Sequence, residues 1–561
     1  MNHKTISLYL MLFVCYGQSI LGKSATPEEM RSPVNQVFQF MQSGTCSAWA
    51  DSTKRNATVY LWIPEQCKKV CGLLVLGANV PEHILVGDAS IRKVCADNDL
   101  AIAWSVSSFM YFSKKLPRDK HQLEYPVIAG FLQQLLNGLA TTSGYEEIAT
   151  VPWLPIGESG HLEMVDALLE SNPNRCMAGI FVKNNHLPPV NREVPTLVAY
   201  GTAQEWSQDK SDIRSKWNDI TKAYEATIKN RKDFPNWAFT YVVDGSSGHF
   251  DCSDRLTKYM ARYIDFVAKA RLTSDGSSKL KALNLDKGFL ADLAVPGHEN
   301  YKATAFNQTA IEKRALPWYF DKASAEEAQA IAAINWKAET QMVGVLNAKN
   351  DSLLPFNFNG IQKIKSLQMD EDGITFSIKT KTLNEIPANF AAAGNSLAQS
   401  TTSPVVEWGC GQFEPLGNSK FRIALDRTWP NGADYFIIRQ KGNDTTREIV
   451  VPVAFDIKSV KNNEGKVQKI SFDPIADVKV GTKFINLSAQ SDAGLPVSYY
   501  VIAGPAIIKD GKLIFTQIPP RSHFPITVTV AAWQWGTKSE PKIKMAEIVK
   551  QTFNIEKQTN F

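Results

Sequence analysis

Seven short apolar runs alternate with longer amphipathic segments between residues 58 and 272. Continuous apolar runs favour strands buried on both faces, and apolar residues at helical spacing favour helices between them. Together they predict an α/β fold, a doubly wound and mostly parallel sheet covered by helices. Ligands of such sheets bind at the carboxyl ends of the strands. The apolar runs are TVYLWIP (58–64), CGLLVLGA (71–78), LAIAWSV (100–106), VPWLPIG (151–157), MAGIFVKN (177–184), PTLVAYG (195–201) and WAFTYVVDG (237–245).

The length of the chain and its changes of pattern predict several domains. At 561 residues it is too long for a single ordinary core. In the C-terminal part, short strands and turn signals alternate in the rhythm of a β-sandwich. There, DAGLPVSYY (492–500) resembles a turn of bacterial immunoglobulin-like repeats, which implies an Ig-like module. We expect a signal peptide (1–22), a catalytic α/β domain (45–300), a helical extension with a β-rich domain (301–460) and the sandwich (466–557).

The first 22 residues are typical of a secretory signal peptide. Lys4 precedes an apolar stretch over 6–14, which is too short to span a bilayer as a helix. Ser19 and Gly22 supply the small residues of a cleavage site, and no later segment predicts a membrane span. Cys15 lacks the small preceding residue of a lipid-anchor cysteine, so we do not expect a lipoprotein. The protein is therefore expected to be exported, to the periplasm or the extracellular space.

Charge and cysteine content narrow the function classes. The net charge of +5 is small for this length, and no cluster of Lys and Arg with interleaved aromatics suggests a nucleic-acid partner. Cys67 and Cys71 have the spacing of some metal pairs, but no second pair of Cys or His has a matching spacing. We expect a local disulfide or plain burial for this pair, and neither a metal nor an organic cofactor.

Ser159 lies in PIGESGHLEM (155–164), between an apolar run and a predicted helix. A nucleophile on a sharp strand-to-helix turn occupies this place, in the pattern G-x-S-x-G. Here Gly160 comes one position early, and His161 stands where the second glycine is usual. Because a serine hydroxyl needs a base to become a nucleophile, we searched the eight histidines. His249 follows the last predicted strand of the α/β region, on a glycine-rich loop, and is assigned as the base.

The third member of a catalytic triad orients the histidine. It is expected on the loop after PTLVAYG, the strand that precedes the strand of His249. Glu205 lies four residues past Gly201 on that loop and is our choice. The chain order Ser159, Glu205, His249 is that of α/β-hydrolases. The sequence therefore predicts the α/β-hydrolase fold and a Ser-His-Glu acyl-enzyme mechanism.

An oxyanion hole needs two backbone N–H donors. Gly160 follows the nucleophile and is expected to supply the first. The segment LGANVPEH (76–83) is expected to supply the second, from Ala78 or Asn79. Other side chains near the same edge are candidate substrate contacts, although such residues are more often surface charges or packing groups. They are Glu158, His161, Trp206 and Glu82.

Three segments resemble a group of secreted bacterial α/β-hydrolases, the carbohydrate esterases of Bacteroidetes with a pectin methylesterase-like branch. The segments are SGYEEIATVPWLPIGESG (143–160), VPTLVAYGTAQEW (194–206) and DGSSGHFDCSDRLTKYMARYIDFVAKARL (244–272). The family usually has G-H-S at the nucleophile, where this chain has Glu158 before Ser159, and a GEYEW-like acid loop, where it has GTAQEW. The resemblance implies the triad residue by residue and implies no substrate preference.

We therefore expect an exported serine esterase that removes methyl or acetyl groups from plant cell-wall polysaccharide, with pectin as the foremost candidate. The segment NHLPPVNRE (185–193) is short and polar where many lipases carry a lid, and an open serine suits a hydrated polymer. Arg92, Arg192 and Lys183 are candidate partners for uronic-acid carboxylates. Two alternatives stay open: a serine peptidase of the same fold, and a non-catalytic carbohydrate-binding protein on a hydrolase scaffold.

Overall fold

An eight-stranded sheet forms the centre of the fold, with the strand order β1-β2-β4-β3-β5-β6-β7-β8. β1 is antiparallel to β2, β2 is antiparallel to β4, and the other neighbouring pairs are parallel. The expected mostly parallel α/β-hydrolase sheet is thereby confirmed. The strands are β1 (Phe40–Cys46), β2 (Arg55–Trp62), β3 (Gly72–Leu76), β4 (Leu100–Ser105), β5 (Trp153–Glu158), β6 (Gly179–Val182), β7 (Thr196–Gly201) and β8 (Phe239–Asp244).

The computed structural model describes most of the chain. Residues 1–35 and several shorter stretches lie outside the described residues. The described ranges are 36–106, 117–183, 193–201, 216–245, 247–273, 277–293, 302–334, 338–356, 361–365, 367–388, 390 and 393–558.

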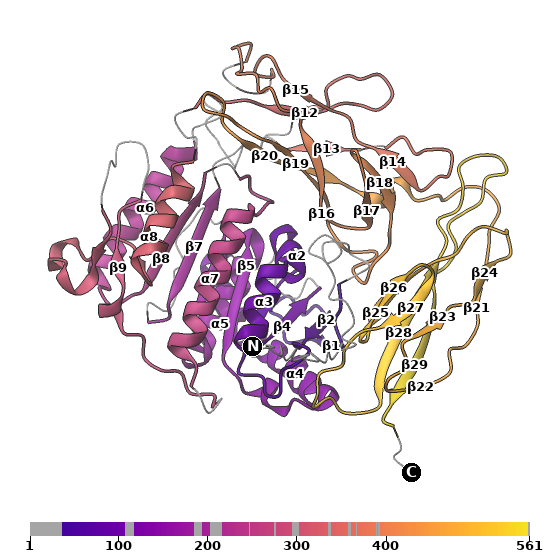
Figure 1. Ribbon diagram of the computed structural model, residues 1–561, viewed down its shortest axis with the longest axis horizontal. Helices are drawn as coiled ribbons and strands as arrows, with labels where there is room; N and C mark the ends of the chain where they lie inside the picture. Colours follow the sequence, from indigo (N-terminus) through magenta and orange to yellow (C-terminus); the bar gives the residue numbers. More distant parts are fainter. Residues whose placement is uncertain are drawn as a thin grey trace, which may run out of the picture.

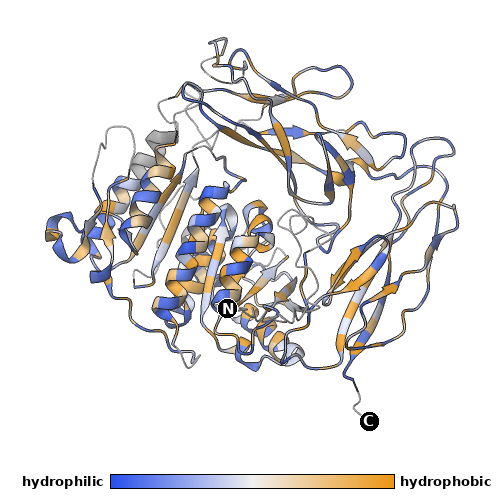
Figure 2. Ribbon diagram, viewed as in Figure 1, coloured by the Kyte–Doolittle hydropathy of each residue, from blue (hydrophilic) through white to orange (hydrophobic). Residues whose placement is uncertain are grey.

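Helices cover both faces of the central sheet (Figure 1). Strands inside the sheet, such as β3 and β4, are mainly apolar because they are buried on both sides, whereas the helices carry hydrophilic faces (Figure 2). No helix in the described ranges has the length and apolar character needed to cross a membrane. One apolar cluster joins a face of the sheet to α4 (Tyr125–Ser143), α5 (Leu162–Ser171) and α6 (Lys216–Asp233). A second joins the other face to α2 (Val80–Gly87), α3 (Ala89–Asp97), α7 (Asp254–Arg271) and α8 (Lys322–Ala332).

The helical extension expected from residue 301 is confined to α8 in the described part of that segment. Ahead of α8 the chain forms a small antiparallel sheet of β9 (Phe289–Leu290), β10 (Thr304–Ala305) and β11 (Trp318–Tyr319). Trp318 and Tyr319 are buried in the same apolar cluster as α7. The packing of these two aromatic side chains favours a strand here, although the neighbouring sequence has a helical composition.

The middle of the chain forms β-sheets that lie above the central sheet in Figure 1. One of them, here named the accessory sheet, has the order β13-β20-β19-β16, and β16 contacts α2. Its strands are β13 (Gln362–Ile364), β16 (Val405–Cys410), β19 (Asp434–Gln440) and β20 (Ile449–Phe455). A second sheet of β14 (Thr375–Ser377), β17 (Phe413–Gly417) and β18 (Lys420–Ile423) packs on it through phenylalanines: the Phe413 and Phe436 rings lie 4.4 Å apart.

The C-terminal region is a β-sandwich. Phe515 and Phe553 bring its two main sheets into contact, with ring centroids 6.1 Å apart. The region packs against the α/β fold, because Arg521 forms an ion pair with Glu147 at 2.9 Å. Its sheets are β22-β29-β28-β25 (Val478–Lys479, Val549–Glu556, Ile526–Trp533, Ser498–Ala503), β23-β27-β26 (Phe484–Asn486, Lys512–Phe515, Ala506–Lys509) and β21-β24 (Ile470–Phe472, Ala489–Ser491). The Ig-like module type stays a prediction.

Among the described residues all seven cysteines are free thiols. Cys67 is buried and Cys71 is half-buried. Burial raises the pKa of the Cys67 thiol, so it stays protonated at neutral pH. Plain burial, rather than a local disulfide, is the arrangement that this pair adopts.

Candidate active site

Ser159 lies on a sharp turn between β5 and α5. Its φ of +49° is rare for a residue other than glycine and marks a strained position held by its surroundings. A 3₁₀ turn over Ser159–His161 leads directly into α5. Gly157 allows this tight turn, because a Cβ there would lie 2.4 Å from the carbonyl oxygen of His161. The local geometry is therefore that of a nucleophile elbow.

His161 takes the position where the usual pattern has its second glycine, and Gly77 makes room for it. A Cβ at Gly77 would lie 2.4 Å from His161 Nδ1. The turn carries a histidine side chain at position 161 in place of a glycine, and the absence of a side chain at Gly77, on the loop after β3, leaves space for it. This explains how the chain departs from G-x-S-x-G and still forms the turn.

The structure brings Ser159 and His249 together from positions 90 residues apart. Ser159 Oγ lies 2.9 Å from His249 Nε2, within hydrogen-bond distance. His249 stands on the loop between β8 and α7, and Phe250 packs edge-on against its ring at 4.5 Å. Both residues follow strands whose carboxyl ends point to the same edge of the sheet. This pairing is the first requirement for an activated serine.

Glu82, Glu158 and His161 form a buried cluster beneath the turn. Glu82 Oε1 accepts the backbone N–H of Glu158 at 3.0 Å and lies 2.9 Å from His161 Nδ1. Glu158 Oε1 lies 3.2 Å from His249 Nε2, on the side of the ring that faces Ser159. All three side chains are at most 2% exposed. The sequence suggested them as substrate contacts, whereas the structure places them inside the protein, where Glu82 supports the turn.

A buried network holds the start of the loop that carries His249. Lys183 Nζ donates to Ser247 Oγ at 2.9 Å and lies 3.6 Å from Asp244 Oδ2. Ser247 Oγ in turn donates to Asp251 Oδ2 at 2.8 Å. Lys183 has a φ of +54° and no exposed side-chain surface, so it is an internal counter-ion and not a surface cation.

The end of the same loop is fixed by Asp244 and Ser253. Ser253 Oγ donates to Asp244 Oδ1 at 2.8 Å and also accepts the N–H of Leu256, which caps α7. Because Asp244 contacts both Lys183 and Ser253, it joins the two ends of the loop. His249 is thus carried by a loop anchored on both sides.

Arg439 of β19 reaches this loop from the accessory sheet. Its Nη2 donates to Asp251 Oδ1 at 3.2 Å, and its Nε donates to Glu407 at 2.8 Å. Burial lowers the pKa of Arg439, but the carboxylates of Asp251 and Glu407 outweigh it, so the net shift is upward and the guanidinium stays charged. Tyr435, on the same strand, packs on Phe250 at 5.1 Å. The accessory sheet therefore supports the loop of His249.

The expected oxyanion donors follow the carboxyl ends of β3 and β5, which are neighbours in the sheet. Gly160 is the residue after Ser159 in the 3₁₀ turn. Asn79 caps α2, and its side chain accepts the N–H of Val80 at 3.1 Å. His83 hydrogen-bonds to the backbone of Ala78; its burial and the nearby His161 lower its pKa to about 4, so it is neutral.

Several predicted site residues lie outside the described residues: Glu205, Trp206 and Arg192. Arg92 does not face a ligand. Its Nε donates to the carbonyl of Val86 at 2.8 Å, and its guanidinium lies 4.8 Å from the Trp62 ring.

Sequence reasoning missed Asp251, Ser247, Arg439 and Gly77. Ser247 and Asp251 flank His249 within the segment DGSSGHFDC (244–252), so the sequence alone could have predicted that they lie near it. Arg439 carries no comparable signal, because it lies 188 positions beyond Asp251 in a strand of another sheet.

No family model matches the chain, and a search of curated proteins finds no match. Solved structures that align with part of it include S-formylglutathione hydrolase from Agrobacterium tumefaciens (12% identity, 41% of this chain and 94% of that chain, TM-score 0.26). Others are the LpqC poly(3-hydroxybutyrate) depolymerase from Bordetella parapertussis (12%, 44% and 96%, 0.28) and a ferulic acid esterase (13%, 41% and 99%, 0.27). Likenesses this low do not identify the family or the reaction of this chain.

Proposed function

We propose that this protein is a serine esterase with Ser159 as the nucleophile and His249 as the base. The observation that carries the proposal is the 2.9 Å distance between Ser159 Oγ and His249 Nε2, with Ser159 at positive φ on a strand-to-helix turn. Neither feature alone distinguishes an active site from a loop. Their coincidence at the carboxyl edge of an α/β-hydrolase sheet supports acyl transfer.

In the proposed reaction, His249 Nε2 takes the proton of Ser159 Oγ as the oxygen attacks the ester carbonyl. The N–H of Gly160 and an N–H from Ala78 or Asn79 stabilise the oxyanion. The alcohol leaves with the proton from His249, and an acyl-enzyme remains on Ser159. Water then attacks this ester and gives a proton to His249, which returns it to Ser159 Oγ as the free acid leaves. Glu205 is proposed to orient His249.

We propose that the ester is a methyl or acetyl group on a plant cell-wall polysaccharide. The short, polar segment 185–193 supports a hydrated polymer, and pectin is the foremost candidate, although the family resemblance itself implies no substrate preference. Two of the three cations considered for uronic-acid carboxylates are engaged inside the protein: Arg92 binds backbone carbonyls and Lys183 binds Ser247 and Asp244. Support for an acidic polymer therefore has to come from elsewhere in the site.

The experiment that tests the proposal compares the wild type with Ser159→Ala on p-nitrophenyl acetate. Removing a serine nucleophile lowers kcat by at least about 10⁴-fold in enzymes of this mechanism. Equal turnover in the two proteins would exclude Ser159 as the nucleophile and favour a binding protein. Turnover of an aminoacyl p-nitroanilide but not of the acetate would favour the peptidase alternative.

We propose also that the chain is exported after removal of residues 1–22. Expression in a bacterial host followed by N-terminal sequencing of the secreted protein tests this. A mature protein that begins close to residue 20 or 23 is expected, and an intact Met1 would contradict it.

A further inference from the structure

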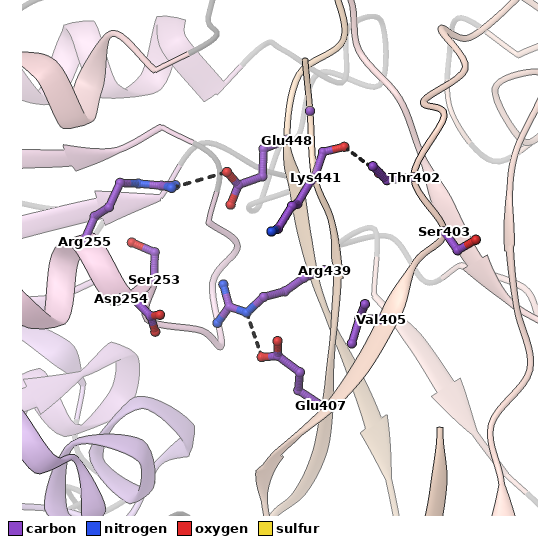
Figure 3. A pocket seen from close by; sticks show the side chains of 11 residues that line it. Ser253, Asp254, Arg255, Thr402, Ser403, Val405, Glu407, Arg439, Lys441 and Glu448 are labelled. Atoms are coloured by element: carbon purple, nitrogen blue, oxygen red, sulfur yellow. Dashed lines mark hydrogen bonds and ion pairs between the residues drawn. The ribbon is translucent and has the colours of Figure 1, made fainter. Parts of the chain in front are cut away.

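A groove opens between the start of α7 and the accessory sheet, with a volume of about 580 Å³. Figure 3 shows the side chains that line it, from the start of α7 and its N-cap on one side and from β16, β19 and the segments next to these strands on the other. This volume is in the range of ligand sites, which are common where domains meet. Neither Ser159 nor His249 lines the groove, so it is a place for a part of the substrate beyond the ester.

The groove lies next to the loop that carries His249. Its lining residues Ser253, Asp254 and Arg255 begin four positions after His249. Arg439 also lines it, and the same side chain binds Asp251 on the His249 loop. A chain whose ester lies at Ser159 can therefore extend past the loop into this space.

Charges of both signs line the groove in equal number. The cations are Arg255, Arg439 and Lys441, and the carboxylates are Glu407, Glu448 and Asp254. Glu448 binds Arg255 at 3.3 Å and Glu407 binds Arg439 at 2.8 Å, and Figure 3 marks both pairs with dashed lines. Thr402 and Ser403 add hydroxyl groups, and Val405 adds one apolar side chain.

Such a lining discriminates between classes of substrate. A polyuronate gains no net attraction from this lining, because its three cations are matched by three carboxylates, and Arg255 and Arg439 are already paired with Glu448 and Glu407. A lipid would leave the charged groups without solvent or partners. Sugar hydroxyls each donate and accept a hydrogen bond, so they match carboxylates and cations presented side by side.

We propose that this groove is a subsite for a neutral, hydroxyl-rich sugar chain, and that the esterase acts on esters of a neutral polysaccharide in preference to a polyuronate. The inference rests on the proposed esterase function but replaces pectin, a polyuronate, with a neutral polysaccharide as the preferred substrate. It assigns Glu448 and Lys441 as specificity-determining residues, because both line the groove from the connection between β19 and β20.

The test measures binding and turnover separately. Calorimetry with the Ser159→Ala variant compares xylohexaose, a neutral chain, with hexagalacturonate, an acidic chain of the same length. We expect the neutral chain to bind at least about tenfold more tightly, the difference produced by one charge-assisted contact. Equal binding, or tighter binding of hexagalacturonate, would overturn the inference.

Kinetics on acetylated xylo-oligosaccharides then locate the site. We expect Glu448→Gln and Lys441→Ala each to raise KM about fivefold to tenfold, since each loses a charged hydrogen-bonding group. Lys363 is an exposed residue of β13 in the same sheet but outside the groove, so Lys363→Met is the matched control and should keep the wild-type KM. A KM that stays at the wild-type value in both groove variants would overturn the assignment.

The two proposals fail in different ways. If Ser159→Ala turns over esters as fast as the wild type, the esterase proposal fails, and the calorimetric ranking still decides the groove. If Ser159 is essential but the groove variants and the chain charge have no effect on KM or binding, the subsite fails alone.

Discussion

Arg439 of the accessory sheet donates a hydrogen bond to Asp251 at 3.2 Å, two residues past His249 on the loop between β8 and α7. Asp251 has no exposed side-chain surface and also accepts from Ser247. The loop is therefore held from within the α/β fold and from a separate β-sheet at once. This makes the accessory sheet part of the machinery that positions His249, rather than a spacer.

Asp251→Asn is expected to weaken both stability and catalysis. The amide keeps the shape of the carboxylate but loses the charge that pairs with Arg439, and breaking a buried ion pair costs about 3 kcal/mol. Because the loop carries His249, kcat on p-nitrophenyl acetate should fall about tenfold, with KM little affected. Urea unfolding and steady-state kinetics measure the two effects.

The control for this variant is Glu414→Gln in the same region. Glu414 forms an ion pair with Arg422 between β17 and β18, where the arginine is 49% exposed. Surface pairs of this kind contribute at most about 1 kcal/mol. If Asp251→Asn behaves like Glu414→Gln in kcat, the Arg439 contact has no role in positioning His249.

Gly77→Ala is expected to disturb the nucleophile turn. The new methyl group would lie 2.4 Å from His161 Nδ1, so His161 or the loop must move. Overpacking of this kind costs about 1–3 kcal/mol, and activity should fall with it. Gly130→Ala in α4 is the matched control: nothing lies within 4 Å of its Cβ, and alanine there should stabilise the helix by about 0.5–1 kcal/mol. Equal unfolding midpoints for the two variants would contradict this account.

His83 is expected to make the fold sensitive to acid. Burial, followed by the nearby His161, lowers its pKa from 6.5 to about 4 in the folded protein. Between pH 6.5 and 4 the unfolded chain therefore binds a proton at His83 that the folded chain does not. The contribution of neutral His83 to the free energy of unfolding is complete above pH 6.5 and is lost as the pH falls towards 4. The difference amounts to at most about 3 kcal/mol.

The measurement is the free energy of unfolding in urea at pH 7, 5.5 and 4.5. His83→Gln should show a shallower decline with acid than the wild type. His523→Gln, which changes an exposed histidine of the C-terminal region, should keep the wild-type slope. Parallel pH profiles for the wild type and His83→Gln would show that His83 is not responsible.

Two glutamates are candidates for the carboxylate that assists His249, and their variants distinguish them. Glu158 lies on the Nε2 side of the ring, beside Ser159, whereas the acid of a triad binds the opposite nitrogen. We expect Glu205→Gln to lower kcat about 10³- to 10⁴-fold and Glu158→Gln to lower it less than tenfold. The opposite order on p-nitrophenyl acetate would move the acid to Glu158.

Much of the α/β fold could be predicted from the sequence, because its strands are buried on both faces. The run that forms β3 is apolar without interruption, and so are the runs of β4 and β7. Ser159 and His249 could be placed together because each directly follows such a strand. Local pattern and chain order were enough for these two residues.

Other features depend on contacts that a local pattern does not encode. Lys183 reads as a surface cation, yet its left-handed backbone turns it into the protein beside Asp244. Arg439 lies in the segment that was predicted to be β-rich, but nothing in its sequence indicates that it faces Asp251. The start of the helix that contains Glu82 could have been predicted from the sequence, since Asn79 caps the helix and Pro81 lies in its first turn.

The most direct test of the central claim is covalent labelling with a fluorophosphonate, followed by mass spectrometry of the peptides. Because His249 activates Ser159 in this account, the wild type should gain one adduct, on the peptide that contains Ser159. Ser159→Ala should gain none, and His249→Ala should label far more slowly. An adduct on another residue, or equal labelling of the wild type and Ser159→Ala, would contradict the assignment of Ser159 as the nucleophile.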